Sequence, residues 1–483
     1  MKKEINPIVQ NKMDGLLASV PEERREEVEK LLHTISAEET DTGAIVALFN
    51  LPSPEDSAML QSLNSRSSGG MFVNLRKVLL KGSSDFMESF YVNYGDKSIG
   101  DCGTVTIYLD GISMIAAKQL QNWPLYSGQE TSTRYVAMTK LGCYDPIDLE
   151  NTRMIIDMLM DFYEEGIRVL PEYLKARFPM DPKPSDKTDG EHKAQYEKTI
   201  NAKMYDILGA FLPAGARTNA SIHMNLRQID EQQRLLIYNP SGEVSGIAEN
   251  ILNVLKSNFP ATYTKKKSYP EQEEYWKMCA EDLCYFDPDD TTWPEFQMWG
   301  TVHMTDFRKY QKYIDARPKK TELPKVMGKL GDIHFKILLD YRSFRDIQRQ
   351  RNGITEIPLL TIKYGFENWY LKQLPENLKD RAISLLREVE KLVFELSTQI
   401  SKFDLQYFIP MGYKCPCEFS RNLVSEVFVQ ELRTGLAVHP TVRNMEKKCA
   451  EWMMREFPDL KLHVEMSDSE WDMKRGLHDI VEK

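Results

Sequence analysis

Residues 127–135 read Ser-Gly-Gln-Glu-Thr-Ser-Thr-Arg-Tyr, and they combine a carboxylate, several hydroxyls, a guanidinium and a phenol in one short stretch. An arginine offers a planar fork for phosphate, serine hydroxyls add donors, and a glutamate can accept from a ribose hydroxyl or an imide nitrogen. This mixture favours a site for an anion and a heterocycle, with Glu130, Ser132, Arg134 and Tyr135 as the candidates. A polar loop capped by Ser and Thr is the alternative interpretation.

A second group of chemically capable residues lies at 345–351, which read Arg-Asp-Ile-Gln-Arg-Gln-Arg. Guanidinium groups bind phosphate through paired N–H donors, so Arg349 and Arg351 could bind a nucleotide. A solvated helix face would also account for these charges.

The elements that must position both groups occur twice in the same order. In each half a strand enters a helix (106–113 and 335–343), and a long helix follows, over roughly 148–170 in the first half and with an apolar face from Ile383 to Ile400 in the second. Then come Phe-Leu-Pro at 211–213 or Phe-Ile-Pro at 408–410, and Asn-Leu at 225–226 or 422–423. The order and spacing indicate a duplicated unit.

Length and this repeat divide the chain into four predicted segments. A chain of 483 residues exceeds the size at which a single core keeps growing. We predict a helical N-terminal segment over 1–65, with Val28, Leu31, Leu32 and Ile35 at helical spacing, and a first domain over 66–258. A connector over 259–325 and a second domain over 326–483 complete the organisation.

Composition excludes several classes of protein. A net charge of −10 argues against a broad nucleic-acid-binding surface, which needs a positive face. No stretch approaches eighteen consecutive apolar residues, and no apolar run follows the two lysines at the start, so we expect no membrane span and a cytoplasmic protein. Seven irregularly spaced cysteines fit a reducing compartment, and eight histidines without paired spacing predict no metal site.

Residues 127–135 resemble the signature of the flavin-dependent thymidylate synthases. In that family Arg-His-Arg is followed by a serine, Asn-Glu, a second serine and Arg-Tyr. Ser127, Glu130, Ser132, Arg134 and Tyr135 match its second part in register, with Gln129 in place of Asn. Asn-Trp-Pro at 122–124 occupies the Arg-His-Arg positions.

The second half resembles the parts of the signature that the first half lacks. Residues 345–351 are similar to the Arg-His-Arg stretch, with Gln350 in place of His. Glu-Leu-Arg at 431–433 follows Asn422 at the family's spacing, so Arg433 resembles the arginine that contacts the pyrimidine. In the family each active site lies between subunits. The resemblance therefore implies that two degenerate halves of one chain complete one composite site.

The resemblance implies an α+β fold, with two tandem copies of a mixed sheet flanked by helices packed as a pseudo-dimer, and a homodimer that mimics the family's tetramer. It implies methylation of deoxyuridylate (dUMP) at C5, with FAD as cofactor, methylenetetrahydrofolate as carbon donor and NADPH as reductant. Arg433 would favour the N3-ionised uracil, so no enzyme nucleophile is needed. The implied nucleotide contacts are Glu130, Ser132, Arg134, Tyr135, Gln348, Arg349 and Arg433. The implied FAD contacts are Ser98, Asn225, Arg227, Arg349, Gln350 and Arg351.

Two other functions stay open. Residues 95–98 resemble the family's upstream Gly-His-x-Ser/Thr motif, with Asp96 in place of His. This departure and those at Gln129 and Gln350 would suit flavin-dependent transfer of a one-carbon unit to a different pyrimidine nucleotide. The broken Arg-His-Arg stretch of the first half would suit a nucleotide-binding protein without catalysis.

Overall fold

The computed structural model describes residues 7–40, 44–265, 269–288 and 292–478, which form two compact units. Unit 1 comprises Met1–Ile107, Ile222–Asn239 and Val244–Ala280, and unit 2 comprises Tyr108–Ser221, Pro240–Glu243 and Glu281–Lys483. The sequence predicts no apolar leader after the two N-terminal lysines, and the first six residues lie outside the described residues. Within the described ranges, no helix has both the length and the apolar character needed to cross a bilayer.

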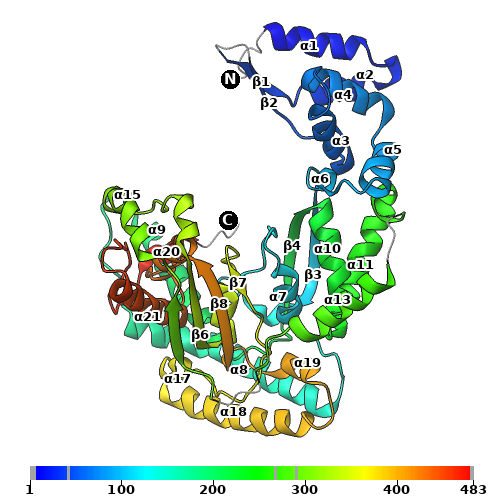
Figure 1. Cartoon of the computed structure of the whole chain (residues 1–483). Helices are drawn as coiled ribbons and strands as arrows, with labels where there is room; N and C mark the ends of the chain where they lie inside the picture. Colours follow the sequence, from blue (N-terminus) through cyan, green and yellow to red (C-terminus); the bar gives the residue numbers. More distant parts are fainter. Residues whose placement is uncertain (1–6, 41–43, 266–268, 289–291, 479–483) are drawn as a thin grey trace. The chain divides into compact units, whose positions relative to one another are not determined.

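Unit 1 is mainly helical (Figure 1). Its N-terminal part packs helices around one apolar core that includes Val28, Leu32 and Ile35, as the helical spacing predicted, whereas Leu31 is only partly buried. The antiparallel pair β1 and β2 also falls within this predicted helical segment. The elements are α1 (Pro7–Ala18), α2 (Arg25–Leu32), β1 (Ser36–Glu39), β2 (Ile45–Leu48), α3 (Pro54–Asn64), α4 (Gly70–Lys81), α5 (Ser84–Phe86), α6 (Lys97–Gly100), α10 (Leu226–Leu236), α11 (Gly242–Asn258), α12 (Pro260–Tyr263) and α13 (Pro270–Leu283).

Unit 2 contains a four-stranded antiparallel sheet with the order β5-β6-β8-β7 (Figure 1). Its strands are β5 (Phe296–Gly300), β6 (Asp332–Asp340), β7 (Ile354–Thr355) and β8 (Lys414–Asn422). In β6 every second residue from Ile333 to Leu339 is buried, as expected for a strand with one face on the core. Strands β3 (Thr104–Ser113) and β4 (Arg217–Asn225) form a separate pair. The division of the chain between the two units falls within each strand, after Ile107 in β3 and after Ser221 in β4.

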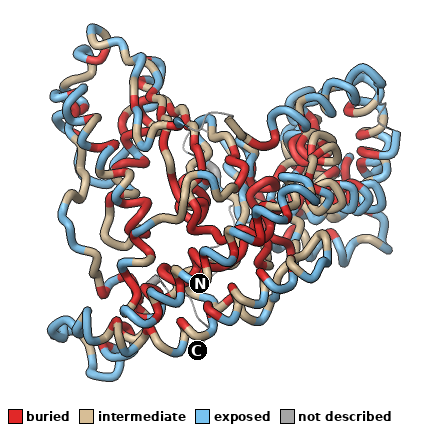
Figure 2. Tube along the Cα trace, turned by 90° about the horizontal axis from the view of Figure 1, so that it is seen from below, coloured by how far each residue is buried: buried red, intermediate tan, exposed pale blue. Residues whose placement is uncertain are grey.

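Three long helices pack together in unit 2, and one of them carries Asp206 beside the candidate residues. Helix α8 (Glu150–Arg177) packs against α9 (Asp189–Leu208) and α18 (Glu376–Leu396). Buried and exposed residues alternate along such helices in the pattern of an amphipathic packing surface (Figure 2). The remaining helices are α7 (Met114–Gln121), α14 (Met304–Phe307), α15 (Gln311–Ala316), α16 (Tyr341–Ile347), α17 (Asn368–Lys372), α19 (Lys402–Leu405), α20 (Leu423–Arg433) and α21 (Pro440–Glu456).

Residues 210–216 and 407–413 run antiparallel to each other and join the two repeat regions. The N–H groups of Ala214 and Gly215 donate to the carbonyls of Ile409 and Tyr407, at 3.0 and 2.8 Å. In the opposite direction the N–H groups of residues 411 and 412 donate to the carbonyls of residues 212 and 210, at 3.0 and 2.7 Å. Each segment thus makes the same hydrogen bonds to the other.

The predicted elements are largely present, and an α+β chain is confirmed. Strands 106–113 and 335–343 are β3 and β6, and each leads directly into a helix. Helix α8 continues through Pro171 to Arg177, beyond the predicted end near residue 170, whereas α18 stops at Leu396, before Ile400. The predicted connector 259–325 contributes β5 to the sheet of unit 2, so part of it is built into that core.

The crossing of residues 210–216 and 407–413 leaves no room for a side chain at Gly215. A Cβ there would lie 2.7 Å from the carbonyl oxygen of Tyr144 and 2.8 Å from that of Tyr407, both backbone atoms. We expect Gly215→Ala to lower the free energy of unfolding by about 1–3 kcal/mol because the backbone must shift. Urea unfolding followed by circular dichroism measures this. Gly190→Ala, with open space around its Cβ in α9, is the control and should be neutral or slightly stabilising.

Candidate active site

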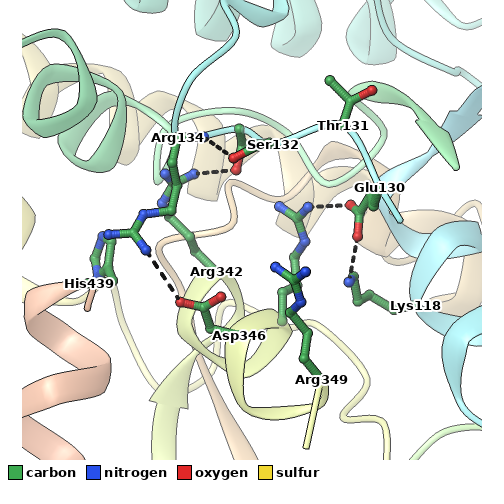
Figure 3. Close-up of a pocket in the computed structure, with 11 residues that line it drawn as sticks. Lys118, Glu130, Thr131, Ser132, Arg134, Arg342, Asp346, Arg349 and His439 are labelled. Atoms are coloured by element: carbon green, nitrogen blue, oxygen red, sulfur yellow. Dashed lines mark hydrogen bonds and ion pairs between the residues drawn. The ribbon is translucent and has the colours of Figure 1, made fainter. Parts of the chain in front are cut away.

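The sequence motifs of both repeat regions meet in one small cavity of about 70 Å³ in unit 2 (Figure 3). Its walls come from α7, from the segment that follows Gln129, from α16 with the residues after it, and from the start of α21. The lining residues are Lys118, Glu130, Thr131, Ser132, Thr133, Arg134, Arg342, Arg345, Asp346, Arg349 and His439. Five cationic side chains face two carboxylates, so the cavity has an excess of three positive charges when His439 is neutral.

Glu130 is the centre of one ion-pair cluster in this cavity (Figure 3). One carboxylate oxygen accepts from Lys118 Nζ at 2.7 Å and from Gln121 Nε2 at 3.0 Å, and the other accepts from Arg345 Nη2 at 2.5 Å. Burial alone would raise the pKa of Glu130, but Lys118 and Arg345 outweigh it and hold that pKa below its usual range. Glu130 is therefore an ionised carboxylate that joins α7 to α16.

Asp206 on α9 is the centre of a second cluster and is fully buried. Its carboxylate accepts from Arg134 Nε at 2.9 Å, pairs with Arg475, and lies 3.7 Å from Arg342 Nη2. Burial would raise the pKa of Asp206, but the neighbouring arginines hold it below its usual range. A buried carboxylate held this way fixes three guanidinium groups from distant parts of the sequence.

Asp346, on α16, is the second of the two carboxylates that line the cavity. Its Oδ2 lies 3.9 Å from Arg433 Nη1 and 4.0 Å from Arg134 Nη1, and Arg433 Nη2 donates to its backbone carbonyl at 3.0 Å. The pKa of Asp346 is lowered, because these arginines outweigh the effect of burial. Arg433 is thereby held at the edge of the site.

His439 is the buried N-cap residue of α21 and also faces the cavity. Its Nδ1 lies 2.8 Å from Thr441 Oγ1, and its Nε2 lies 3.2 Å from the carbonyl oxygen of Asp206. Burial lowers the pKa of His439 to about 3, and Arg342 and Arg134 add to this effect while Asp206 opposes it. The imidazole is therefore neutral at physiological pH.

Arg349 connects this cavity to a larger one of about 810 Å³. Arg349 is exposed and lines both cavities. Gln350, Arg351 and Asn352 continue along the larger cavity, and the Arg351 guanidinium lies 4.9 Å from the centre of the Tyr126 ring. Cationic donors beside an aromatic ring form a surface suited to a phosphate-bearing ligand with a flat ring system.

The structure brings most of the predicted nucleotide contacts together at the small cavity, but Tyr135 and Gln348 do not line it. Glu130, Ser132, Arg134 and Arg349 line the small cavity, with Arg433 at its edge. Tyr135 is not among the lining residues. Gln348 is buried, and its Nε2 donates to the carbonyl of Lys118 at 2.9 Å, so it joins α16 to α7.

The predicted flavin contacts fall into two groups. Arg349, Gln350 and Arg351 line the larger cavity of unit 2. Asn225 and Arg227 belong to unit 1, as does Ser98, and each has a local partner. Asn225 caps α10 by accepting from the Gln228 N–H at 2.8 Å, Arg227 pairs with Asp101 at 2.8 Å, and Ser98 donates to Asp96 at 2.6 Å.

Several residues of the site were not singled out from the sequence. Arg342 and Arg345 precede the predicted Arg349 at helical spacing, a signal that the cations of α16 and the residue after it share one face. Lys118 is the lone charge within an otherwise apolar stretch, which was also visible in the sequence. Asp206 gave no local signal, because its partners lie far away along the chain. Among the described residues, no group of three or more His, Cys, Asp or Glu could hold a metal ion.

Asp206→Asn tests the charge cluster. Because the folded pKa lies below the unfolded value of about 3.9, the ionised carboxylate stabilises the fold above about pH 4 and loses this effect as the pH falls. We expect the variant to lose about 3–5 kcal/mol of unfolding free energy at pH 7, and its difference from wild type to narrow below about pH 4. Urea unfolding over this pH range measures both effects. Asp148→Asn, at an exposed ion pair with Arg153, is the control and should change little.

Comparison with known proteins gives the family of this site. Residues 50–261 match the family model described as thymidylate synthase complementing protein. A UPF0159 protein of Chlamydia muridarum is 24% identical, over 93% of this chain and 97% of its own. A UPF0159 protein of Thermoplasma acidophilum is also 24% identical, over 76% of this chain and 85% of its own. Residues 50–261 include the Glu130 to Tyr135 motif, and this segment of the chain is of the thymidylate synthase complementing family, which confirms the recognition made from the motifs.

Proposed function

We propose that the chain is a flavin-dependent thymidylate synthase, which methylates dUMP at C5 with methylenetetrahydrofolate as carbon donor and NADPH as reductant. The observation that carries this proposal is the composite cavity, where Glu130 and Arg134 of one repeat face Arg345 and Arg349 of the other. Its excess positive charge suits a nucleotide monophosphate. The proposed compartment is the cytoplasm, which fits seven free cysteine thiols.

The residues of the larger cavity fit an FAD by the chemistry of their donors. Arg349, Arg351 and Lys325 would pair with the pyrophosphate, and the rings of Tyr126 and Phe428 offer apolar contact for the flavin. Arg421 also lines this cavity, and its buried Nε and Nη2 have no hydrogen-bond partner within the described residues. When bound, FAD would supply the electrons that reduce the transferred carbon.

The chain's own residues would bind and polarise the nucleotide. Arg134 and Arg349 would hold the phosphate, with Ser132 as a further donor. Arg433 would lie against the uracil, where a permanent positive charge favours the N3-ionised ring and raises electron density at C5. Lys118, Arg342, Arg345 and His439 of this cavity are buried, and charges interact more strongly where water is excluded.

A fused pseudo-dimer explains why one chain holds both parts of the motif. The mutual hydrogen bonds of 210–216 and 407–413 support a twofold relation between the repeats. A second matching pair supports it too: the N–H of Met114 donates to the Ala216 carbonyl, and the N–H of Tyr341 donates to the Tyr413 carbonyl, both at 3.0 Å. We further propose that two chains form a homodimer, so that four repeats reproduce the family's tetramer.

The same relation argues for one nucleotide site per chain. The β7–β8 register pairs Ile354 with Ser420 and Thr355 with Phe419. Continued by two residues, it would place Ile357 opposite Cys417, as Glu130 stands opposite Ala220, so the counterpart of Glu130 would be apolar. Residue 286 pairs with this segment, since the Phe286 N–H donates to the Ile357 carbonyl at 2.7 Å. A second composite site would therefore lack the counterpart of Glu130, and the segment at Phe286 lies against its position.

A specific observation supports an alternative substrate. Asp346 brings a carboxylate to the cavity, and a carboxylate accepts hydrogen bonds but does not donate them. The exocyclic amine of a cytosine nucleotide could donate to it, as the uracil carbonyl could not. Mass analysis of the products from dUMP and dCMP would separate the two substrates.

The first experiment is a visible absorption spectrum of the protein with FAD, with and without dUMP, followed by a turnover assay. We expect a flavin band that shifts when dUMP binds, and formation of dTMP. Arg433→Ala should lower kcat by at least about 100-fold with little loss of flavin, because it removes charge stabilisation from the reacting ring. Failure to take up FAD would contradict the proposal, and unchanged turnover in Arg433→Ala would contradict the role of that residue.

Isothermal titration with dUMP tests the number of sites and the role of Arg349. We expect one dUMP per chain, whereas two would contradict the loss of the second site. Arg349→Ala should weaken binding at least about tenfold, because it removes an arginine from the cavity's phosphate-binding donors. Arg387→Ala, on an exposed face of α18, is the matched control and should leave affinity unchanged.

A further inference from the structure

Lys118 is a buried lysine in the candidate site that the family motif does not include. Its side chain is 2% exposed, and Nζ donates to Glu130 at 2.7 Å and to Gln121 Oε1 at 2.7 Å. The remaining charged groups that act on it are Arg345 and Arg349, both from the second repeat region. A lysine ammonium has three donors, and the described residues occupy two of them.

Lys118 and Arg345 occupy the same position in their two repeats. Ser113 caps α7 and Asp340 caps α16, and each cation is the fifth residue after its cap. Both side chains converge on the Glu130 carboxylate, one at each oxygen. The two equivalent helices therefore supply matching charges to one acid, which fixes the distance between their ends at the cavity.

We propose that Lys118 is a positioning residue of this site, which fixes Glu130 against Arg345 and whose protonation sets the upper pH limit for anion binding. The proposal rests on the proposed nucleotide function for the identity of the anion, but the charge balance of the cavity does not depend on it.

Loss of the Lys118 proton changes both charge and geometry. With Lys118 neutral, Glu130 is compensated by Arg345 alone, and the excess positive charge of the cavity falls by one. Burial lowers the pKa of Lys118 to about 8, with Glu130 opposing the shift and Arg345 and Arg349 adding to it. Anion affinity should therefore be constant near neutral pH and decline above about pH 8.

The test is the pH profile of dUMP binding to the full-length chain, from about pH 6.5 to about pH 9.5, with sulfate as a second probe whose charge is constant over this range. In the wild type we expect affinity for both probes to fall, approaching about tenfold per pH unit well above pH 8. Lys118→Arg keeps its charge throughout and should lack this decline. Lys118→Met should bind at least about tenfold more weakly at pH 7, with a flat profile.

Glu130→Gln provides a second route if the Lys118 variants do not fold, as judged by circular dichroism. Removing the carboxylate removes the group that keeps Lys118 protonated, so the decline in sulfate affinity should move to lower pH. A wild-type profile that is flat to about pH 9.5, or a decline that persists in Lys118→Arg or stays in place in Glu130→Gln, would overturn the proposal. Sulfate binding with the expected profile but no dUMP binding would refute the nucleotide function and leave the role of Lys118 standing.

Discussion

The candidate site depends on buried carboxylates that are compensated by cations from distant parts of the chain. Asp206 holds Arg134, Arg342 and Arg475, and Glu130 holds Lys118 and Arg345. Neither acid could be buried alone, because the cost of removing a charge from water is recovered only through well-placed partners. The same pairs fix the orientation of the arginines that face the cavity.

Because the cations are already oriented, an anion can bind with little further loss of side-chain conformational entropy. Guanidinium groups that were free in solvent would have to be ordered when a ligand binds, whereas here their orientation is already set by Asp206, Glu130 and Asp346. Arg349 is exposed and lies between the two cavities. It is thus the cation most able to move when a ligand enters, and it connects the proposed nucleotide and flavin regions.

The twofold relation that we propose for the repeats would explain how a chain can lose motif residues and keep a site. On that proposal, Ile357 occupies the position in one repeat that Glu130 occupies in the other. The crossing at 210–216 and 407–413 keeps both halves in register through backbone hydrogen bonds, which tolerate side-chain change. Backbone hydrogen bonds thus hold the two segments together, while the side chains around the cavity carry the chemistry.

The sequence by itself determined the order of elements, the mixed α+β character and the residues of the Glu130 to Arg134 motif, because strand alternation, helical spacing and short motifs are local signals. The resemblance to the family's Arg-His-Arg stretch also indicated Arg349, Gln350 and Arg351. No local signal indicated that Gln348 joins two helices, or that part of the predicted connector forms β5 and pairs with β6. Only the tertiary structure decided that Asp206 anchors the arginines and that Lys118 shares Glu130 with Arg345, because charge compensation is made between residues that are close in space and far apart along the chain.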